Sequence, residues 1–395
     1  MAYIALVWIG IELVGTDVGY LQSAQYAGLL IVTLGAGAFI DRIPPTLSMA
    51  VIGLLSALLC LMLVIWFQLT GPAVLPLVVT AVGLSSLHAI YLSVLLSNIP
   101  RLVQTQALLQ AINGLFDASS RLSRLLGPSL AGVLILLLPI IHFFSLYAVA
   151  LLFLVWAIWQ IRTSFHRPSE QANEPAQKIT TRLLRGVTLV RQHRDIRFLL
   201  ACNLLAIAAW NMGVVLGIAI IFKTIPPADL LGTNLTSYGL VMAAYGCGDL
   251  LSNILVSAWQ PKRRWTAMCS GYVVLGGGLS LIPLTMAVAP DVLQLPAIVG
   301  FALISGLGGP MFYLPMITRV QTRFTDGDLA AVIRLRLAGV GVGLLLSALI
   351  SPFLFEQLGV QAGTAAAGLM LIAIGLAGMF LKNRVTKPDH TAGGT

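Results

Sequence analysis

Long stretches without a charged side chain constrain this chain more than any other feature of its sequence. Residues 43–100 contain no Asp, Glu, Lys or Arg, and Thr70-Gly71-Pro72 divides them into two apolar segments. Each segment is long enough to cross a bilayer as a helix, which takes about 20 residues. Only 9% of the 395 residues are charged, whereas an ordinary soluble domain carries about 25%. The sequence therefore predicts an all-α integral membrane protein and excludes soluble enzymes, fibres and disordered chains.

Apolar stretches of this kind predict eleven full-length spans. They are residues 22–40, the two halves of 43–100, the two halves of 125–161, 198–222, 238–257, 265–290, 292–318, 337–355 and 357–381. The first apolar stretch, residues 2–15, is only about half as long as a span needs to be. We therefore expect twelve helices, of which the first is truncated at its N-terminus.

The basic residues predict how these spans are oriented. If residues 2–15 count as the first span, 22 of the 23 Lys and Arg residues fall on one side, and only Lys223 falls on the other. Loops rich in Lys and Arg face the cytoplasm. We expect a 6+6 helix bundle in a bacterial inner membrane with both chain ends cytoplasmic. This topology accounts for the net charge of +9, so no nucleic-acid partner is needed to explain it.

The one long polar stretch divides the chain into parts. We predict an N-terminal six-helix half over 1–162, a cytoplasmic linker over 163–197, a C-terminal six-helix half over 198–382 and a cytoplasmic tail over 383–395. Within the linker, residues 180–197 place apolar and basic side chains on opposite faces of a helix. Such an amphipathic helix either lies along the inner membrane surface or rests, solvated, on the bundle.

The two halves carry a related glycine pattern. Gly28-Leu29 is followed after five residues by Gly35-x-Gly37, and Gly239-Leu240 is followed after five residues by Gly246-x-Gly248, at an offset of 211. The pattern lies in the second helix of each predicted half, which indicates a duplicated six-helix unit. Duplicated halves with a cavity between them are typical of alternating access, in which one half rocks against the other.

Five stretches resemble the major facilitator superfamily of transporters or one of its branches. Gly37-Ala-Phe-Ile-Asp41-Arg42 resembles the family's G-x-x-x-D-R motif, and Ser123-Arg-Leu-Leu-Gly127-Pro128-Ser-Leu-Ala131-Gly132 resembles the G-x-x-x-G-P-x-x-G-G motif of its proton-driven exporters. Residues 98–108, 183–197 and 238–240 resemble its bacterial drug and siderophore efflux branch, which includes the enterobactin exporter and macrolide efflux proteins.

This resemblance implies a secondary transporter that exports a small amphipathic compound, such as a drug, a macrolide or a siderophore. The proton gradient would supply the energy, with no cofactor or metal, and the protein would work as a monomer in the lipid bilayer. No nucleotide-binding G-x-x-x-x-G-K-[ST] motif and no hydrolase triad are present in the sequence, so we do not expect an enzyme. Two alternatives stay open: an importer of a nutrient with the same fold, and a truncated remnant that does not transport.

Charged residues inside the spans are candidates for gating or coupling, because charges within a membrane are costly. Asp117, Arg121 and Arg124 share one face of the predicted fifth helix, as gate or structural residues or as the coupling site. The resemblance implies an inner gate that includes Gly37, Asp41 and Arg42. Asp249, in the equivalent helix of the second half, is a candidate partner for basic residues 262–264.

Uncharged polar and aromatic side chains in the central helices are the candidates for contact with a substrate. They are Gln25, His88, Asn113, Asn203, Trp210 and Asn211. We interpret Glu12, near the outer end of the first span, as a carboxylate at the membrane interface rather than a proton carrier. The four cysteines lie in apolar stretches with no metal-binding or disulfide spacing.

Overall fold

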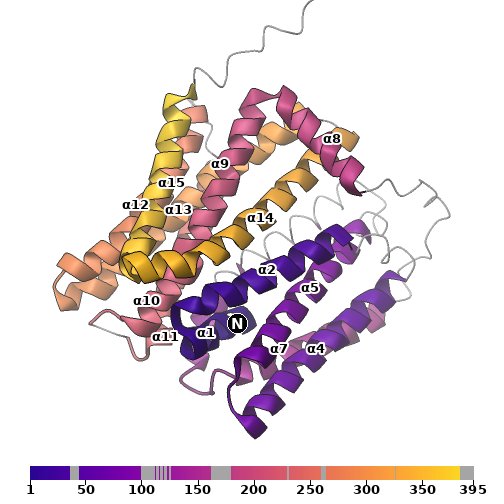
Figure 1. The fold of residues 1–395 in the computed structure, drawn as a ribbon, viewed down its shortest axis with the longest axis vertical. Helices are drawn as coiled ribbons and strands as arrows, with labels where there is room; N and C mark the ends of the chain where they lie inside the picture. Colours follow the sequence, from indigo (N-terminus) through magenta and orange to yellow (C-terminus); the bar gives the residue numbers. More distant parts are fainter. Residues whose placement is uncertain are drawn as a thin grey trace, which may run out of the picture.

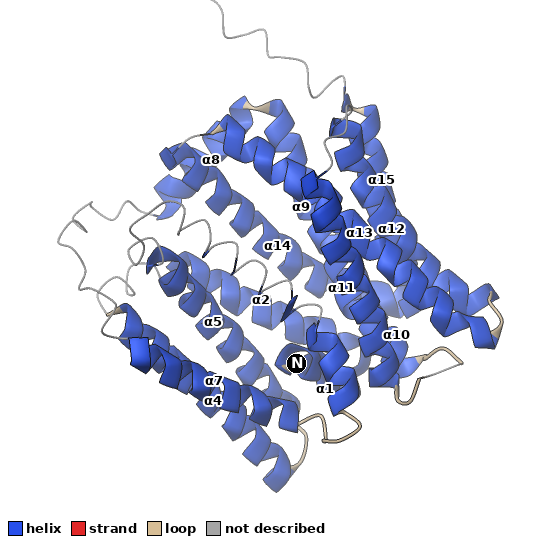
Figure 2. Ribbon diagram, turned by 180° about the vertical axis from the view of Figure 1, so that it is seen from behind, coloured by secondary structure: helices blue, strands red, loops and turns tan. Residues whose placement is uncertain are grey.

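Helices make up all the regular structure that a computed structural model describes for this chain (Figures 1 and 2). The described residues are 1–35, 44–98, 112, 115, 119, 122–123, 126–161, 179–228, 231–258, 264–324 and 326–382. Within them, ten helical segments are long and apolar enough to cross a membrane. Large apolar side chains such as Leu69, Phe153 and Phe380 cover the outside of the bundle, where hydrocarbon rather than water would solvate them.

The helices gather into an N-terminal and a C-terminal group (Figure 1). The N-terminal group contains α1 (Ala2–Val14), the 3-10 turn η1 (Gly15–Asp17), α2 (Val18–Gly35), α4 (Pro45–Thr70), α5 (Val74–Asn98) and α7 (His142–Ile161). The C-terminal group contains α9 (Arg194–Trp210), the π-helical η4 (Asn211–Gly217), α10 (Ile218–Thr224), α11 (Asn234–Ala258), α12 (Arg264–Val288), α13 (Asp291–Arg323), α14 (Asp326–Leu358) and α15 (Val360–Phe380). Between the groups, α2 packs against α14.

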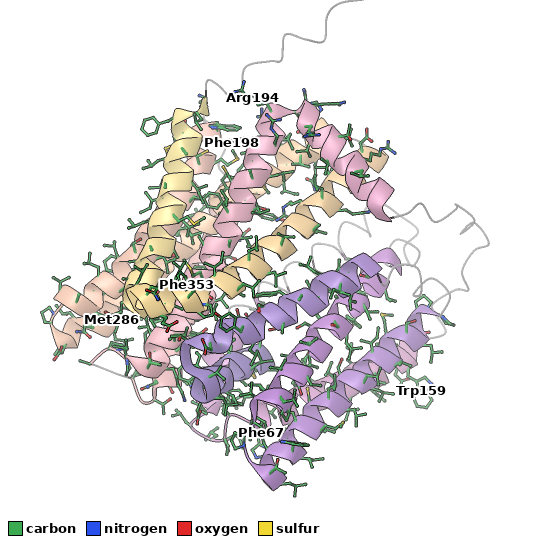
Figure 3. The ribbon with its side chains drawn as sticks, in the orientation of Figure 1. Phe67, Trp159, Arg194, Phe198, Met286 and Phe353 are labelled. Carbon is green, nitrogen blue, oxygen red and sulfur yellow. The ribbon has the colours of Figure 1, made fainter. Side chains whose placement is uncertain are left out.

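Four labelled side chains mark the two ends of the bundle. Figure 3 shows Phe67 and Met286 toward one end, and Arg194 and Trp159 toward the other. We call the end with Arg194 the linker end, because α8 (Ile179–Gln192), the helix of the linker, lies there. The opposite end, which holds the turns at Gly71 and Gly359, is the far end.

Positive-φ glycines mark two turns of the far end. Gly71 has a φ of 87° and follows α4 directly, and Gly359 has a φ of 79° and separates α14 from α15. A residue with a Cβ atom adopts this backbone region only with strain. The break predicted at Thr70-Gly71-Pro72 is therefore confirmed, and its physical reason is the left-handed conformation of Gly71.

The chain enters α14 earlier than the charge pattern predicts. The expected span begins at Leu337 and leaves Arg334 and Arg336 in a connecting loop, but α14 begins at Asp326 and contains both arginines. The loop prediction was wrong because a charge marks where a helix leaves the hydrocarbon, not where its backbone hydrogen bonds end. Arg336 consequently lies in the third turn of a helix, about 15 Å from its first residue.

The short first helix is a central element of the bundle. In α1, Ala5, Leu6 and Val7 are each at most 4% exposed. The helix contacts α2, α5 and α7 of its own group and α10 of the other. Although it has only 13 residues, α1 contributes to the contact between the two groups.

The amphipathic helix α8 packs on α14. A Cβ atom at Gly186 would lie 2.7 Å from the carbonyl oxygen of Ala331, so the two backbones are in close contact. Val190 is buried in a cluster with Val320 and Val332, and Arg185 forms an ion pair with Asp328 at 2.6 Å. The helix therefore rests on the bundle, against α14.

Glycines allow helices of the C-terminal group to touch backbone to backbone. A Cβ atom at Gly306 of α13 would overlap the carbonyl oxygen of Tyr245 in α11, and one at Gly248 of α11 would overlap that of Leu303 in α13. Between membrane helices, such close packing replaces the hydrophobic force that drives packing in water. The crossing of α11 and α13 therefore depends on these two glycines.

We predict that Gly306→Ala destabilises the folded protein by about 1–3 kcal/mol, because the added methyl group must displace the backbone of α11. The measurement is the free energy of unfolding in mixed micelles. Gly300→Ala, on the same helix, is the matched control, because a Cβ atom there meets nothing within 4 Å. Equal stability of the two variants would contradict this account of the crossing.

Candidate functional site

A chain of polar side chains connects the two helix groups at the middle of the bundle. The Tyr26 hydroxyl of α2 donates a 2.8 Å hydrogen bond to the Asn211 side-chain oxygen. Asn211 is fully buried and is the first residue of the π-helical η4. Its side-chain nitrogen lies 3.4 Å from the Ser347 hydroxyl of α14, which donates to the carbonyl of Ala208. We call Tyr3, Gln22, Tyr26, Asn211 and Ser347 the central chain.

Two glutamine side chains of α2 have an oxygen without a hydrogen-bond partner among the described residues. Gln22 donates from its side-chain nitrogen to the Tyr3 hydroxyl at 2.9 Å, and that hydroxyl lies 3.4 Å from the hydroxyl of Tyr26. The side-chain oxygens of Gln22 and Gln25 are buried without a partner among the described residues. Because buried polar atoms are nearly always hydrogen-bonded, these two oxygens are unusual in having no partner among the described residues.

Of the predicted cavity residues, Asn211 belongs to the central chain and Gln25 lies on the same helix as Gln22. Trp210, the neighbour of Asn211, donates from its indole nitrogen to the Tyr245 hydroxyl of α11 at 2.8 Å. His88, by contrast, is exposed on α5 and does not join the chain. Sequence reasoning missed Tyr3, Tyr26 and Ser347, although the four-residue spacing of Gln22 and Tyr26 on one helix face was a usable signal.

An ion pair connects the two groups at the far end. Lys223, at the end of α10, lies 3.1 Å from the carboxylate of Glu12 in α1, and its ammonium lies 5.3 Å from the centroid of the Trp8 ring. Trp8 in turn packs on Tyr238 of α11, with 5.6 Å between ring centroids. The carboxylate interpreted as interfacial thus meets the one basic residue that we assigned to the outer side.

The motif that resembles exporters lies where the two groups touch. A Cβ atom at Gly132 would lie 3.2 Å from Thr236 of α11, and one at Gly239 would lie 2.7 Å from the carbonyl oxygen of Pro128. The Thr236 hydroxyl donates a 2.8 Å bond to the carbonyl of Gly132. We call this contact between 128–132 and 236–239 the seam.

The other motif positions are placed less closely. Ala131 is fully buried, Ser123 is exposed, and a Cβ atom at Gly127 would meet only the chain's first nitrogen, at 3.9 Å. The close approach is therefore made by the second half of the motif.

Several predicted residues lie outside the described part of the chain. They are Gly37, Asp41, Arg42, Asn113, Asp117, Arg121 and Arg124. Asp249 is described and accepts a 2.7 Å bond at its carbonyl from the Asn253 side chain. The side chains of residues 262–264, its expected partners, are not among those described.

Asn203 does not belong to the central chain. It is 7% exposed, and its side-chain nitrogen lies 3.4 Å from the Tyr272 hydroxyl of α12. Among the described residues, no cluster of three or more His, Cys, Asp or Glu side chains is placed to hold a metal ion.

Comparison with known proteins agrees with this architecture. The family model of the Major Facilitator Superfamily matches residues 1–302 and 199–395. The fold is similar to the crystal structure of a single-residue variant of the nucleoside transporter NupG. The TM-score is 0.67 at 12% sequence identity, and the match covers 96% of this chain and 97% of that one. A search of curated protein sequences finds no match.

We predict that Tyr26 and Asn211 are energetically coupled, because their hydrogen bond connects the two groups. In a double-mutant cycle of Tyr26→Phe and Asn211→Ala, the coupling free energy should be about 0.6–1.7 kcal/mol. The free energy of unfolding in mixed micelles is the measured quantity. Thr33→Val removes a hydroxyl that bonds only within α2 and should show no coupling to Asn211→Ala. Additive effects of Tyr26→Phe and Asn211→Ala would refute the contact.

Proposed function

Because the chain belongs to the Major Facilitator Superfamily, we propose that this secondary transporter exports a small amphipathic compound in exchange for protons. A drug, a macrolide or a siderophore is the expected class of substrate. The moving units are the two halves, 1–162 and 198–382, which rock against each other around a central site. No cofactor is required, since the proton gradient supplies the energy.

The observation that carries the direction of transport is the seam. The second half of the motif, which contains Pro128 and Gly132, is in close backbone contact with α11 of the other group. A motif that resembles those of exporters therefore lies at a contact that must change when the far end opens. Proline within the motif also removes a backbone donor and favours a bend in its helix.

The contacts of the far end support entry of substrate from the linker end. Glu12 and Lys223, together with Trp8 and Tyr238, join the two groups there. The linker end gathers the basic residues, and we propose that it is the cytoplasmic side of a bacterial inner membrane. A compound taken up from the cytoplasm would then leave through the far end.

The central chain is the proposed binding region. It offers hydroxyl groups, amides and the unpartnered oxygen of Gln22, and it has no fixed charge; the unpartnered oxygen of Gln25 lies on the same helix as Gln22. Such a surface suits an amphipathic molecule better than a highly charged nutrient. We propose Asp117, Arg121 and Arg124 as candidates for proton coupling, and Gly37, Asp41, Arg42 and Asp249 as the inner gate.

Import of a nutrient is the competing function, with the same fold and the opposite direction. The likeness to a nucleoside transporter bears on the fold alone at 12% identity. The vesicle orientation in which a substrate accumulates decides the direction of transport. A remnant without transport activity would accumulate no substrate in either orientation.

We predict uptake into inverted membrane vesicles that depends on an inside-acid pH gradient, measured with ethidium, erythromycin and a catecholate siderophore as probes. At least one probe should accumulate, and a protonophore should abolish its uptake. Accumulation only in right-side-out vesicles would establish import, and no gradient-dependent uptake of any probe would contradict export.

Gly239→Val tests the seam in the same vesicles. The variant should lower the initial rate of uptake at least about ten-fold while the protein still inserts, because its side chain would overlap the Pro128 carbonyl. Gly277→Val is the control, since a Cβ atom at Gly277 meets nothing within 4 Å. Unchanged uptake by Gly239→Val would remove the seam from the mechanism.

A further inference from the structure

A cavity apart from the central chain has two polar side chains in its wall. The cavity has a volume of about 170 Å³ and lies between α8, α9 and α14. Its walls are mainly apolar and include Val190, Leu200, Leu204 and Val340. Two polar side chains, Asn203 and Arg336, also line it. One ordered water needs only about 10–15 Å³, so the space admits an organic group.

Arg336 brings a positive charge to this cavity without a negative partner among the described residues. The nearby cations Arg185 and Arg319 form ion pairs with Asp328 and Asp195, respectively. The guanidinium of Arg336 instead lies over the ring of Tyr313, 4.8 Å from its centroid, and its Nε atom is buried without an acceptor. A guanidinium stacked on a ring keeps its N–H groups free at the edge, where they can bind an oxyanion.

Asn203 supplies a second polar group at the same wall. The residue is 7% exposed, and its side-chain oxygen is buried without a partner. Its nitrogen faces the Tyr272 hydroxyl at 3.4 Å. Because a hydroxyl can donate as well as accept, a rotated amide keeps that bond and places its NH₂ group where the side-chain oxygen now lies. In either rotamer, one polar atom of Asn203 has no partner among the described residues.

We propose that this cavity binds the carboxylate of an amphipathic organic anion, with Arg336 as the charged contact and Asn203 as the second polar contact. The proposal rests on the proposed function and refines it: the compounds recognised at this cavity carry a negative charge. A carboxylate pairs with a guanidinium through two parallel hydrogen bonds, and the apolar walls accept its hydrocarbon part. Binding of such an anion also offsets the cost of a buried cation in a membrane protein.

The test compares three probes that share one apolar group: 4-phenylbutyrate, 4-phenylbutanamide and 4-phenylbutylamine. Binding to the purified full-length protein in non-ionic micelles is measured by isothermal titration calorimetry, with no gradient. The carboxylate should bind at least about ten-fold more tightly than the amide, and the amine more weakly still. Equal affinities for carboxylate and amide in the wild-type protein would overturn the proposal, whatever the behaviour of any variant.

Variants then locate the charged contact. Arg336→Gln should weaken binding of 4-phenylbutyrate about 10- to 100-fold, and Arg336→Lys should restore part of the affinity. Arg334→Gln is the matched control, because Arg334 is exposed on the same helix and does not line the cavity. If Arg336→Gln fails to fold, Gly339→Leu serves instead: its side chain fills the cavity, and it should abolish binding. An equal loss with Arg334→Gln, or no loss with either cavity variant, would refute the site.

The binding and transport measurements together test the anion site and the exporter function separately. Carboxylate binding without gradient-driven export of any compound would contradict the exporter and leave the anion site standing. Gradient-driven export of neutral compounds by a protein that does not bind 4-phenylbutyrate would leave the exporter standing and overturn the anion site.

Discussion

The cost of placing an unpaired charge in hydrocarbon determines where charged side chains lie along this bundle. Ion pairs lie near its two ends: Glu12 with Lys223 at the far end, and Arg319 with Asp195 at the linker end. Between them, an uncharged hydrogen bond from Tyr26 to Asn211 joins the two groups, and Asn211 also contacts Ser347 within the C-terminal group. Arg336 is an exception, because it lies within the candidate span Ala331–Leu358, in the third turn of α14, and has no ion-pair partner among the described residues. A site for an anionic molecule explains that exception.

The contacts differ in strength within and between the groups. Inside the C-terminal group, Gly248 and Gly306 allow direct backbone contact, which resists separation. Between the groups, one hydrogen bond is worth about 0.6 kcal/mol on average, and an exposed ion pair such as Glu12–Lys223 about 0–1 kcal/mol. Rigid groups joined by weak contacts can rock against each other without repacking. Backbone also comes together across the interface at two places: the seam, with Gly132 and Gly239, and Gly19 of α2, where a Cβ atom would lie 2.7 Å from the carbonyl oxygen of Ala348 in α14.

The sequence predicts the membrane class, the helices and the turn at Gly71, because apolar length and glycine conformation are local properties. It misplaces the start of α14, since charges report the edge of the bilayer and the helix continues beyond it to Asp326. Asn211 is singled out by its polarity alone, but its partner Tyr26 lies 185 residues away. No local pattern encodes that pairing. The sequence does not reveal the cavity at Arg336 for the same reason, because residues of α8, α9 and α14 line it together.

Pulsed electron resonance between spin labels on opposite groups tests alternating access most directly. One pair, at Leu69 and Val288, reports the far end, and the other, at Trp159 and Phe380, reports the linker end; all four side chains are more than half exposed. On addition of a transported compound and an acidic far side, the account predicts that the far-end distance lengthens while the linker-end distance shortens. Two distances that stay constant, or that change in the same direction, would contradict it.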